Sequence, residues 1–251
     1  LFQNQNEQLY LQTFEEIIKY ENQIHLSELR VIMMLLDNFC IIQLNASRFN
    51  FIEHTFKLYQ KMIDLKVLLD DDETILAGQY KNVITIALRT KSYDWANDFL
   101  EKFKDNIRDD QAEAVYIFNK ANIAFEQEHY DNCLYVLSQM IFKDEFYKLT
   151  AKRLVIKSMY MIYQKDRTYY DTLYGNLNAF KKYIYTKKNL PEVYQETNKN
   201  FYKFIQQIFF ASIKNGSDLD NLHFKIDECE MLADKNWLKQ MVNMNLKSLV
   251  S

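Results

Sequence analysis

The side chains that could do chemistry are scattered along this sequence and do not form a motif. No His-x-x-x-His pair places two metal ligands on one helix face. The three glycines are isolated, whereas phosphate-binding loops need clustered glycines. No serine lies in a Gly-x-Ser-x-Gly turn, which would present a nucleophile. We therefore expect a non-enzymatic protein with no catalytic residues, no metal and no cofactor.

The densest acidic run is 70–73, Asp-Asp-Asp-Glu. A calcium loop needs alternating oxygen ligands and a glycine at its bend, and this run has neither. We interpret it as a solvated loop whose carboxylates favour the positive N-terminus of the next helix. The three cysteines are far apart and odd in number, which predicts buried thiols in a reducing compartment and thus a cytoplasmic location.

The segment 143–203 differs from the rest of the chain in charge. It holds 13 Lys and Arg against 6 Asp and Glu, together with 10 of the 18 tyrosines, although the whole chain has a net charge of −3. Clustered cations bind phosphates, and aromatic rings stack on unpaired bases. Nucleic-acid or other polyanion binding is therefore the alternative function. The other interpretation of this segment is a solvated face whose cations pair with acidic residues elsewhere in the chain. The residues expected to carry it are Lys148, Lys152, Arg153, Lys157, Lys181 and Lys182.

The elements that would position these residues are predicted to be helices. Only three glycines and one proline occur in 251 residues, against roughly 7% and 5% in average proteins. Sheets with tight hairpins need residues that tolerate positive φ, and helices do not. No run approaches the ~18 apolar residues of a membrane span. The sequence begins at Leu1 without a methionine, and we expect it to be the C-terminal part of a longer chain.

Apolar periodicity divides the chain into about twelve helices. Ser27, Ser92, Asp109, Ser217 and Asp234 are expected to cap helix N-termini, because their side chains can accept from the first N–H groups. Pro191 suits a first helical position, and Gly216 suits a left-handed C-terminal cap. The predicted spans are 7–21, 27–46, 48–66, 74–90, 92–106, 110–127, 129–142, 145–164, 167–187, 191–214, 218–233 and 235–249.

An internal repeat runs through 74–187. A Tyr-Asp pair recurs at Tyr93, Tyr130 and Tyr170, at intervals of 37 and 40 residues, and each pair opens a predicted helix. The residues at +3, +7 and +10 from each tyrosine share one helix face, and all are apolar. They are Ala96, Leu100 and Phe103, then Cys133, Leu137 and Met140, then Leu173, Leu177 and Phe180. A period of this length built from helix pairs predicts a solenoid over a single domain, 1–251.

This pattern resembles the tetratricopeptide repeat, with small residues in the first helix at Ala87, Ala121 and Ala124. It departs from that repeat in lacking the Trp and Gly of the first helix, the closing proline and the period of about 34. The resemblance implies an all-α, right-handed superhelix of antiparallel helices. The chain also resembles a large family of uncharacterised helical-repeat proteins from Bacteroidetes-type bacteria, in the segments Asn38-Phe39-Cys40-Ile41, Phe56-Lys57-Leu58-Tyr59, Tyr80-Lys81-Asn82-Val83, Asp94-Trp95-Ala96, Tyr130-Asp131, Asp144-Glu145-Phe146-Tyr147 and Ala151-Lys152.

In tetratricopeptide-like stacks the first helix of each pair lines a groove that binds peptides. This resemblance implies two stripes of residues as the partner-binding surface, on the helices expected at 74–90 and 110–127. The leading expectation is therefore a scaffold that binds a protein or peptide segment. The stripes are Lys81, Thr85 and Arg89, and then Phe118, Asn122 and Glu126.

Overall fold

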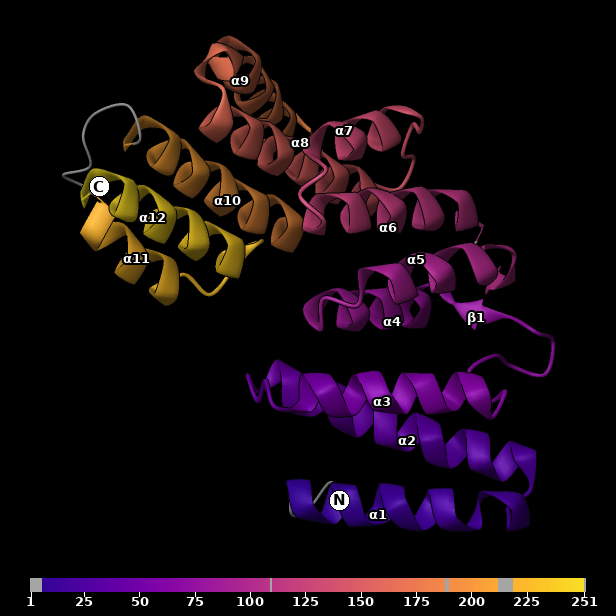
Figure 1. Ribbon diagram of the computed structural model, residues 1–251. Coiled ribbons are helices and arrows are strands. Elements are labelled where there is room, and N and C mark those ends of the chain that lie inside the picture. Colours follow the sequence, from indigo (N-terminus) through magenta and orange to yellow (C-terminus); the bar gives the residue numbers. More distant parts are fainter. Residues whose placement is uncertain (1–5, 109, 188–189, 212–218, 251) are drawn as a thin grey trace. The chain divides into compact units, whose positions relative to one another are not determined.

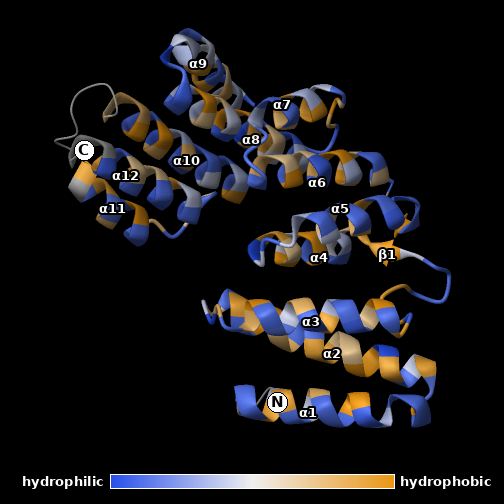
Figure 2. Cartoon of the chain, viewed as in Figure 1, coloured by the Kyte–Doolittle hydropathy of each residue, from blue (hydrophilic) through white to orange (hydrophobic). Residues whose placement is uncertain are grey.

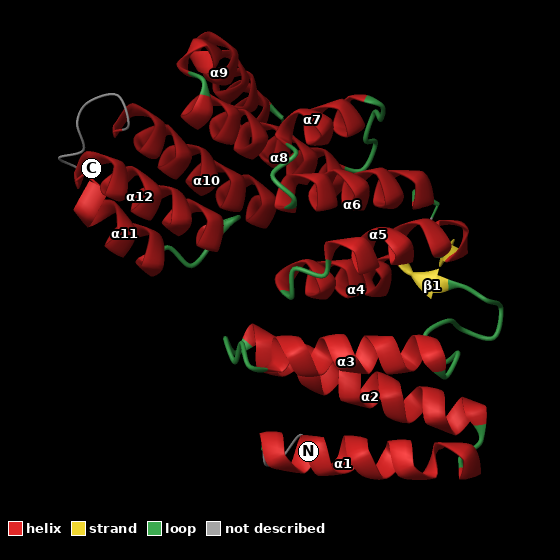
Figure 3. Ribbon diagram, viewed as in Figure 1, coloured by secondary structure: helices red, strands yellow, loops and turns green. Residues whose placement is uncertain are grey.

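The computed structural model describes residues 6–108, 110–187, 190–211 and 219–250, and these are almost entirely helical (Figures 1 and 3). The chain divides into two compact units, Leu1–Gln127 and Glu128–Ser251. The described part of the first unit contains α1 (Glu7–Tyr20), α2 (Leu26–Asn45), α3 (Phe51–Asp64), α4 (Ala77–Arg89), α5 (Tyr93–Lys102) and α6 (Ala112–Glu126). That of the second contains α7 (Tyr130–Ser138), α8 (Glu145–Lys165), α9 (Tyr170–Thr186), α10 (Glu192–Ala211), α11 (Leu219–Glu228) and α12 (Lys235–Val250).

These twelve helices match the twelve expected spans, which confirms the all-α class. The described residues also form three short 3-10 helices, at Glu21–Gln23, Lys104–Asn106 and Arg167–Tyr169. Within each unit, helices that follow one another along the chain pack side by side, as in the pairs α2 and α3, α4 and α5, α7 and α8, and α9 and α10. No described helix combines the length and the hydropathy that a membrane-spanning segment requires.

The expected helix caps are only partly present. α2 begins one residue before Ser27, because the His25 ring accepts from the Ser27 N–H and takes the capping position. Ser92 precedes α5, but its side chain makes no capping bond. Pro191 lies immediately before α10. The expected positions Asp109, Gly216 and Ser217 lie outside the described residues.

A small parallel strand pair replaces the start of the helix expected at 74–90. β1 (Ile75–Leu76) pairs with β2 (Ile107–Arg108), with Ile75 opposite Ile107. The acidic run 70–73 forms the loop before β1, as expected, but its carboxylates do not serve the next helix. Asp72 instead accepts from Arg108 at 3.0 Å, and Asp71 accepts from Arg30 of α2 at 2.5 Å. These long-range ion pairs connect the loop to α2 and β2, and α4 begins only at Ala77.

The Tyr-Asp repeat marks helix starts as expected, since α5, α7 and α9 begin at Tyr93, Tyr130 and Tyr170. Eight of the nine residues on the predicted apolar face are buried. The exception is Met140, which lies beyond the end of α7 and is half-buried. The small residues Ala87, Ala121 and Ala124 are also buried.

Apolar and polar residues occupy different faces of most helices (Figure 2). The first unit has an aromatic cluster in which the Tyr10 ring lies 5.9 Å from Phe39 and 5.7 Å from Phe51. The second unit has a comparable cluster in which the Tyr160 ring meets the Trp237 ring edge-on at 5.8 Å. Aromatic pairs at these separations add to the stability gained from burial alone. Many of the tyrosines and phenylalanines are therefore core packing residues.

Candidate functional site: a lysine-edged groove between α7, α8 and α9

A groove of about 520 Å³ lies among α7, α8 and α9 in the second unit. Ile141 stands at its edge with 87% of its surface exposed. Much of the lining is apolar, while three lysines, Tyr183 and Asn176 supply its polar groups. The lining residues are Leu137, Met140, Ile141, Phe142, Lys148, Ala151, Lys152, Val155, Ile156, Asn176, Ala179, Phe180, Tyr183 and Lys187. A cavity of this size with a few polar groups is typical of a binding site.

The early end of α7 supplies one wall of this groove. The helix was expected to reach residue 142, but it stops at Ser138. The Ser138 hydroxyl donates to the carbonyl of Tyr135 at 2.7 Å, while the N–H of Gln139 turns to Val136 at 3.2 Å. In an α-helix each backbone N–H group bonds to the carbonyl four residues back, so a bond to the carbonyl three residues back marks the end of the helix. Residues 140–142 follow α7 without helical structure, and Met140, Ile141 and Phe142 line the groove beside α8 and α9.

Glu145 organises the lysines at one end of the groove. One carboxylate oxygen accepts from Lys148 at 2.9 Å and from Lys187 at 3.1 Å, and the other accepts from the hydroxyl of Tyr183. Partial burial alone would raise the pKa of Glu145. The hydrogen bonds from Tyr183, Lys148 and Lys187 outweigh it and lower this pKa to about 2. Glu145 therefore stays ionised and holds two lysine ammonium groups at the groove edge.

Lys152 is the cation that Glu145 does not hold. Its Nζ lies 4.9 Å from the centre of the Tyr183 ring, and no described carboxylate lies within ion-pair distance of it. The groove edge thus carries three lysines and one glutamate. An anionic group that enters the groove gains a direct charge partner in Lys152.

Arg153 and Lys157, which the sequence assigns to the polyanion surface, point elsewhere. Asp234, just before α12, accepts from Arg153 Nε at 2.8 Å and from Lys157 Nζ at 3.0 Å. Arg153 also donates to Asn198 of α10 at 2.7 Å, and Lys157 is only 8% exposed. Their positive charges are satisfied inside the unit, which removes both residues from the expected polyanion surface. Asp234 directly precedes α12, as expected for its capping residue, but its carboxylate accepts from α8.

The other four residues of that expected set remain accessible but do not lie together. Lys148 and Lys152 edge the groove described above, whereas Lys181 and Lys182 are exposed on α9. Lys181 lines a different hollow, between α9 and α10. The sequence missed Tyr183, Lys187 and Glu145, because their contacts join helices that are far apart in the chain.

The partner-binding stripes expected in the first unit are partly accessible. On α4, Arg89 is exposed, whereas Lys81 and Thr85 are half-buried. The Thr85 hydroxyl donates to the Lys81 carbonyl at 2.8 Å, so it is satisfied within its own helix. On α6, Glu126 is exposed and Asn122 is half-buried. Phe118 is only 5% exposed, so it is a packing residue and not the surface contact that we expected.

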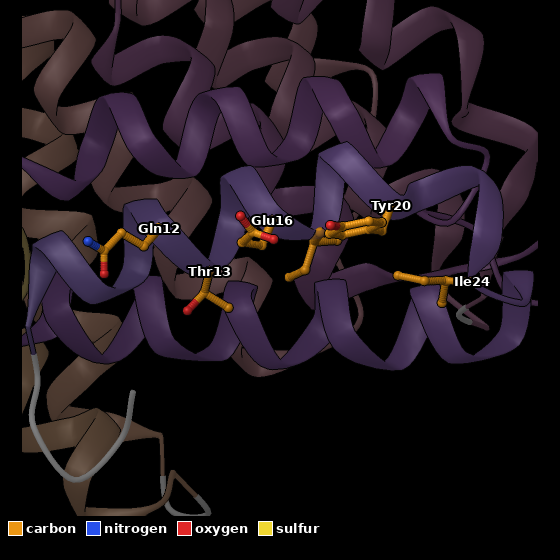
Figure 4. A pocket seen from close by; sticks show the side chains of 6 residues that line it. Gln12, Thr13, Glu16, Tyr20 and Ile24 are labelled. Carbon is orange, nitrogen blue, oxygen red and sulfur yellow. The ribbon is translucent and has the colours of Figure 1, made fainter.

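The first unit also has a hollow along α1, of about 410 Å³ (Figure 4). Figure 4 shows Tyr20 and Ile24 at one end and Gln12 and Thr13 at the other. Its charged residue, Glu16, is exposed and pairs with Lys19 at 3.8 Å. This hollow offers a ligand fewer polar partners than the groove in the second unit.

Within the described ranges, no group of three or more His, Cys, Asp or Glu side chains is placed to hold a metal ion. His129 and Cys133 have the four-residue spacing of a ligand pair on one helix. The His129 side chain is exposed, however, whereas Cys133 is buried and contacts the Ser158 hydroxyl at 3.3 Å. Burial raises the pKa of the Cys133 thiol to about 11, which keeps it protonated and a poor ligand.

No family model, no curated protein and no solved structure matches this chain significantly.

Proposed function

We propose that this protein is a non-enzymatic, tetratricopeptide-like interaction module, and that the groove between α7, α8 and α9 binds a short segment of a partner protein. The observation that carries this proposal is the apolar groove with its lysine edge. The proposed segment places an apolar side chain against Ala151 and Val155 and a carboxylate against Lys152. An acidic residue next to an apolar one has this chemistry.

The repeat supports the proposal. Stacked helix pairs bury their apolar faces against neighbours, and the curvature of such stacks creates concave binding surfaces. At 9 residues, α7 is shorter than α5, with 10, and α9, with 17. The groove lies beside this short helix. A right-handed superhelix of such pairs over 1–251 is part of this proposal, as is the likeness to the Bacteroidetes-type family.

A random peptide library displayed on phage tests the proposal. We expect selection against the protein to enrich peptides with an apolar residue beside Asp or Glu. Binding of those peptides should weaken about tenfold or more when Lys152→Glu reverses the free charge, because a like-charge contact replaces an attractive one. It should also weaken when Ala179→Trp fills the groove, since Ala179 is an exposed lining residue.

Charge reversal at the α4 stripe is the matched comparison. Arg89→Glu makes the same kind of change on an exposed helix position of the first unit. If Arg89→Glu abolishes binding while Lys152→Glu and Ala179→Trp do not, the groove assignment is wrong and the α4 stripe is the binding surface. If no peptide is enriched, the proposed segment chemistry is wrong.

A further inference from the structure

A second hollow, of about 500 Å³, lies between α9 and α10. It is more polar than the groove among α7, α8 and α9 and shares no lining residue with it. Its lining comes from one face of α9 and the facing side of α10. The residues are Lys181, Tyr185, Glu196, Lys199, Asn200, Tyr202, Lys203 and Gln206.

The charge in this hollow is positive. Lys181, Lys199 and Lys203 line it, against one carboxylate, Glu196. In contrast to Arg153 and Lys157, none of these three lysines lies within 4.0 Å of a carboxylate oxygen among the described residues. Three unneutralised ammonium groups around one hollow attract an anion, and the attraction is strongest at low salt.

A buried hydroxyl adds a directional donor to this charge. Tyr202 is only 4% exposed, and its hydroxyl has no hydrogen-bond partner within the described part of the chain. Burial raises the pKa of Tyr202, so the hydroxyl stays protonated and can donate. A buried hydroxyl without a partner destabilises the protein, and a ligand oxygen that accepts from it removes that cost. A phosphate oxygen is such an acceptor.

Tyr185 contributes a flat aromatic surface beside the cations. Its side chain is 55% exposed, and Lys199 Nζ lies 5.4 Å from the centre of its ring. Lys181 Nζ is similarly placed, 5.7 Å from the centre of the Tyr202 ring. Lysines interleaved with tyrosines are the composition of surfaces that bind single-stranded nucleic acid, where cations follow the phosphates and bases stack on rings. A phosphorylated peptide would use the lysines but would leave the exposed ring without a stacking partner.

We propose that the hollow between α9 and α10 binds single-stranded nucleic acid. Lys181, Lys199 and Lys203 neutralise its phosphates, the Tyr202 hydroxyl donates to a phosphate oxygen, and a base stacks on Tyr185. This proposed site is separate from the peptide-binding groove, and its experimental test does not depend on the result for that groove.

Fluorescence anisotropy with a labelled oligothymidylate of about ten nucleotides, a length that covers one binding site, tests this proposal. We expect binding at low salt, with an affinity that falls by ~0.7 log units per log unit of salt for each phosphate neutralised. The double variant Lys181→Gln and Lys199→Gln should therefore reduce the salt slope by ~1.4 as well as the affinity. Lys182→Gln removes one charge from the neighbouring position of α9, outside the hollow, and should change binding much less.

Two tyrosine substitutions separate the contributions of the ring and the hydroxyl. Tyr185→Leu should weaken binding about tenfold, whereas Tyr185→Phe, which keeps the ring, should not. Tyr202→Phe removes only a buried hydroxyl, so we expect weaker nucleic-acid binding together with unchanged or higher thermal stability. A loss of binding in a variant whose circular dichroism spectrum and melting temperature are unchanged is then not a folding defect.

Three results would overturn the proposal. The first is no anisotropy change at low salt. The second is an equal loss of binding in Lys182→Gln and in Lys181→Gln, which would indicate diffuse attraction to the whole basic segment. The third is tighter binding of a labelled phosphoserine peptide than of oligothymidylate, with no effect of Tyr185→Leu, which would assign the hollow to phosphopeptides. The groove variant Ala179→Trp should leave nucleic-acid binding intact, so failure of one site does not affect the test of the other.

Discussion

Arg153 and Asp234 are 81 positions apart in the sequence, yet the guanidinium Nε of Arg153 donates to the carboxylate of Asp234 at 2.8 Å. Lys157 completes the contact from the next turn of α8. The backbone at Asp234 is left-handed, with φ of 53°, a conformation that Asp and Asn tolerate better than most residues. This ion triad links α8 to the loop before α12 and makes the second unit sensitive to acid.

Substitution Asp234→Asn should destabilise the second unit by ~3 kcal/mol, because it leaves two partly buried cations without a counter-charge. Asparagine also tolerates the left-handed backbone conformation, so the loss of stability can be attributed to the removed negative charge. Chemical denaturation followed by circular dichroism measures this change. Asp227→Asn is the matched control, since it removes an exposed ion pair with Lys239 and should have a much smaller effect. Equal losses in the two variants would contradict the prediction.

The same carboxylate predicts the direction of the pH dependence. Burial alone would raise the pKa of Asp234, but the charges of Lys157 and Arg153 lower it to about 2. A group whose pKa is lowered by folding stabilises the protein above its unfolded pKa of ~4 and loses that contribution as the pH falls. The difference in unfolding free energy between the wild type and Asp234→Asn should therefore shrink between about pH 4 and pH 2. A difference in unfolding free energy that stayed constant over this pH range would be evidence against the prediction.

Asp37 should have the opposite effect in the first unit. It is 9% exposed on α2, and its Oδ1 has no hydrogen-bond partner among the described side chains and backbone. Burial raises its pKa, so folding favours the protonated form and stability falls as the pH rises from the unfolded pKa through the folded one. Asp37→Asn should raise the unfolding free energy at pH 7 by ~1 kcal/mol or more, with little change at pH 3. Thermal melts at both pH values, with the exposed Asp64→Asn as control, check this expectation.

The cysteines should differ in reactivity. Burial raises the thiol pKa of Cys40 and of Cys133 to about 11, whereas Cys229 is half-buried. A thiolate-specific reagent such as DTNB needs both exposure and ionisation. We expect one thiol per chain, Cys229, to react in the native protein, and all three to react after unfolding. If the native Cys229→Ser variant still reacted with DTNB as fast as the wild type, this expectation would be contradicted.

The small residues of the repeat should be intolerant of enlargement. Ala87 is fully buried in α4, which packs against α3, α5 and α6. Ala87→Leu should cost ~1–3 kcal/mol through overpacking. Ala179→Leu, at an exposed position of α9, makes the same chemical change and should be nearly neutral. Urea denaturation compares the two, and similar midpoints would show that close helix approach at Ala87 is unnecessary.

The helices could be predicted from the sequence because their causes are local. The spacing of apolar residues after Tyr93, Tyr130 and Tyr170 places eight of nine positions in the core, and each tyrosine begins its helix. The strand pair at Ile75 and Ile107 was missed, because its two strands lie far apart in the sequence and pair through their backbones. Such contacts have no signature in a window of neighbouring residues.

The sites were less predictable than the helices. Lys152 and Arg153 are neighbours in the sequence, yet one edges a groove and the other pairs with Asp234. Their difference depends on which elements pack on each side of α8. The basic, tyrosine-rich composition of 143–203 did indicate where cations and rings gather, but composition does not divide them among a groove edge, a core ion triad and the hollow between α9 and α10.

The early end of α7 at Ser138 also has a consequence for how such a groove could arise or disappear during evolution. No unusual residue creates it: the chain leaves the helix after Ser138, and Met140, Ile141 and Phe142 line the groove instead of continuing α7. Lengthening α7 by one turn would place the Met140 side chain on the repeat's apolar face and would move Ile141 and Phe142, of which Phe142 is now buried, from the positions in which they line the groove. Two proteins could therefore share this fold and most of their buried residues and yet differ in whether they have the site at all.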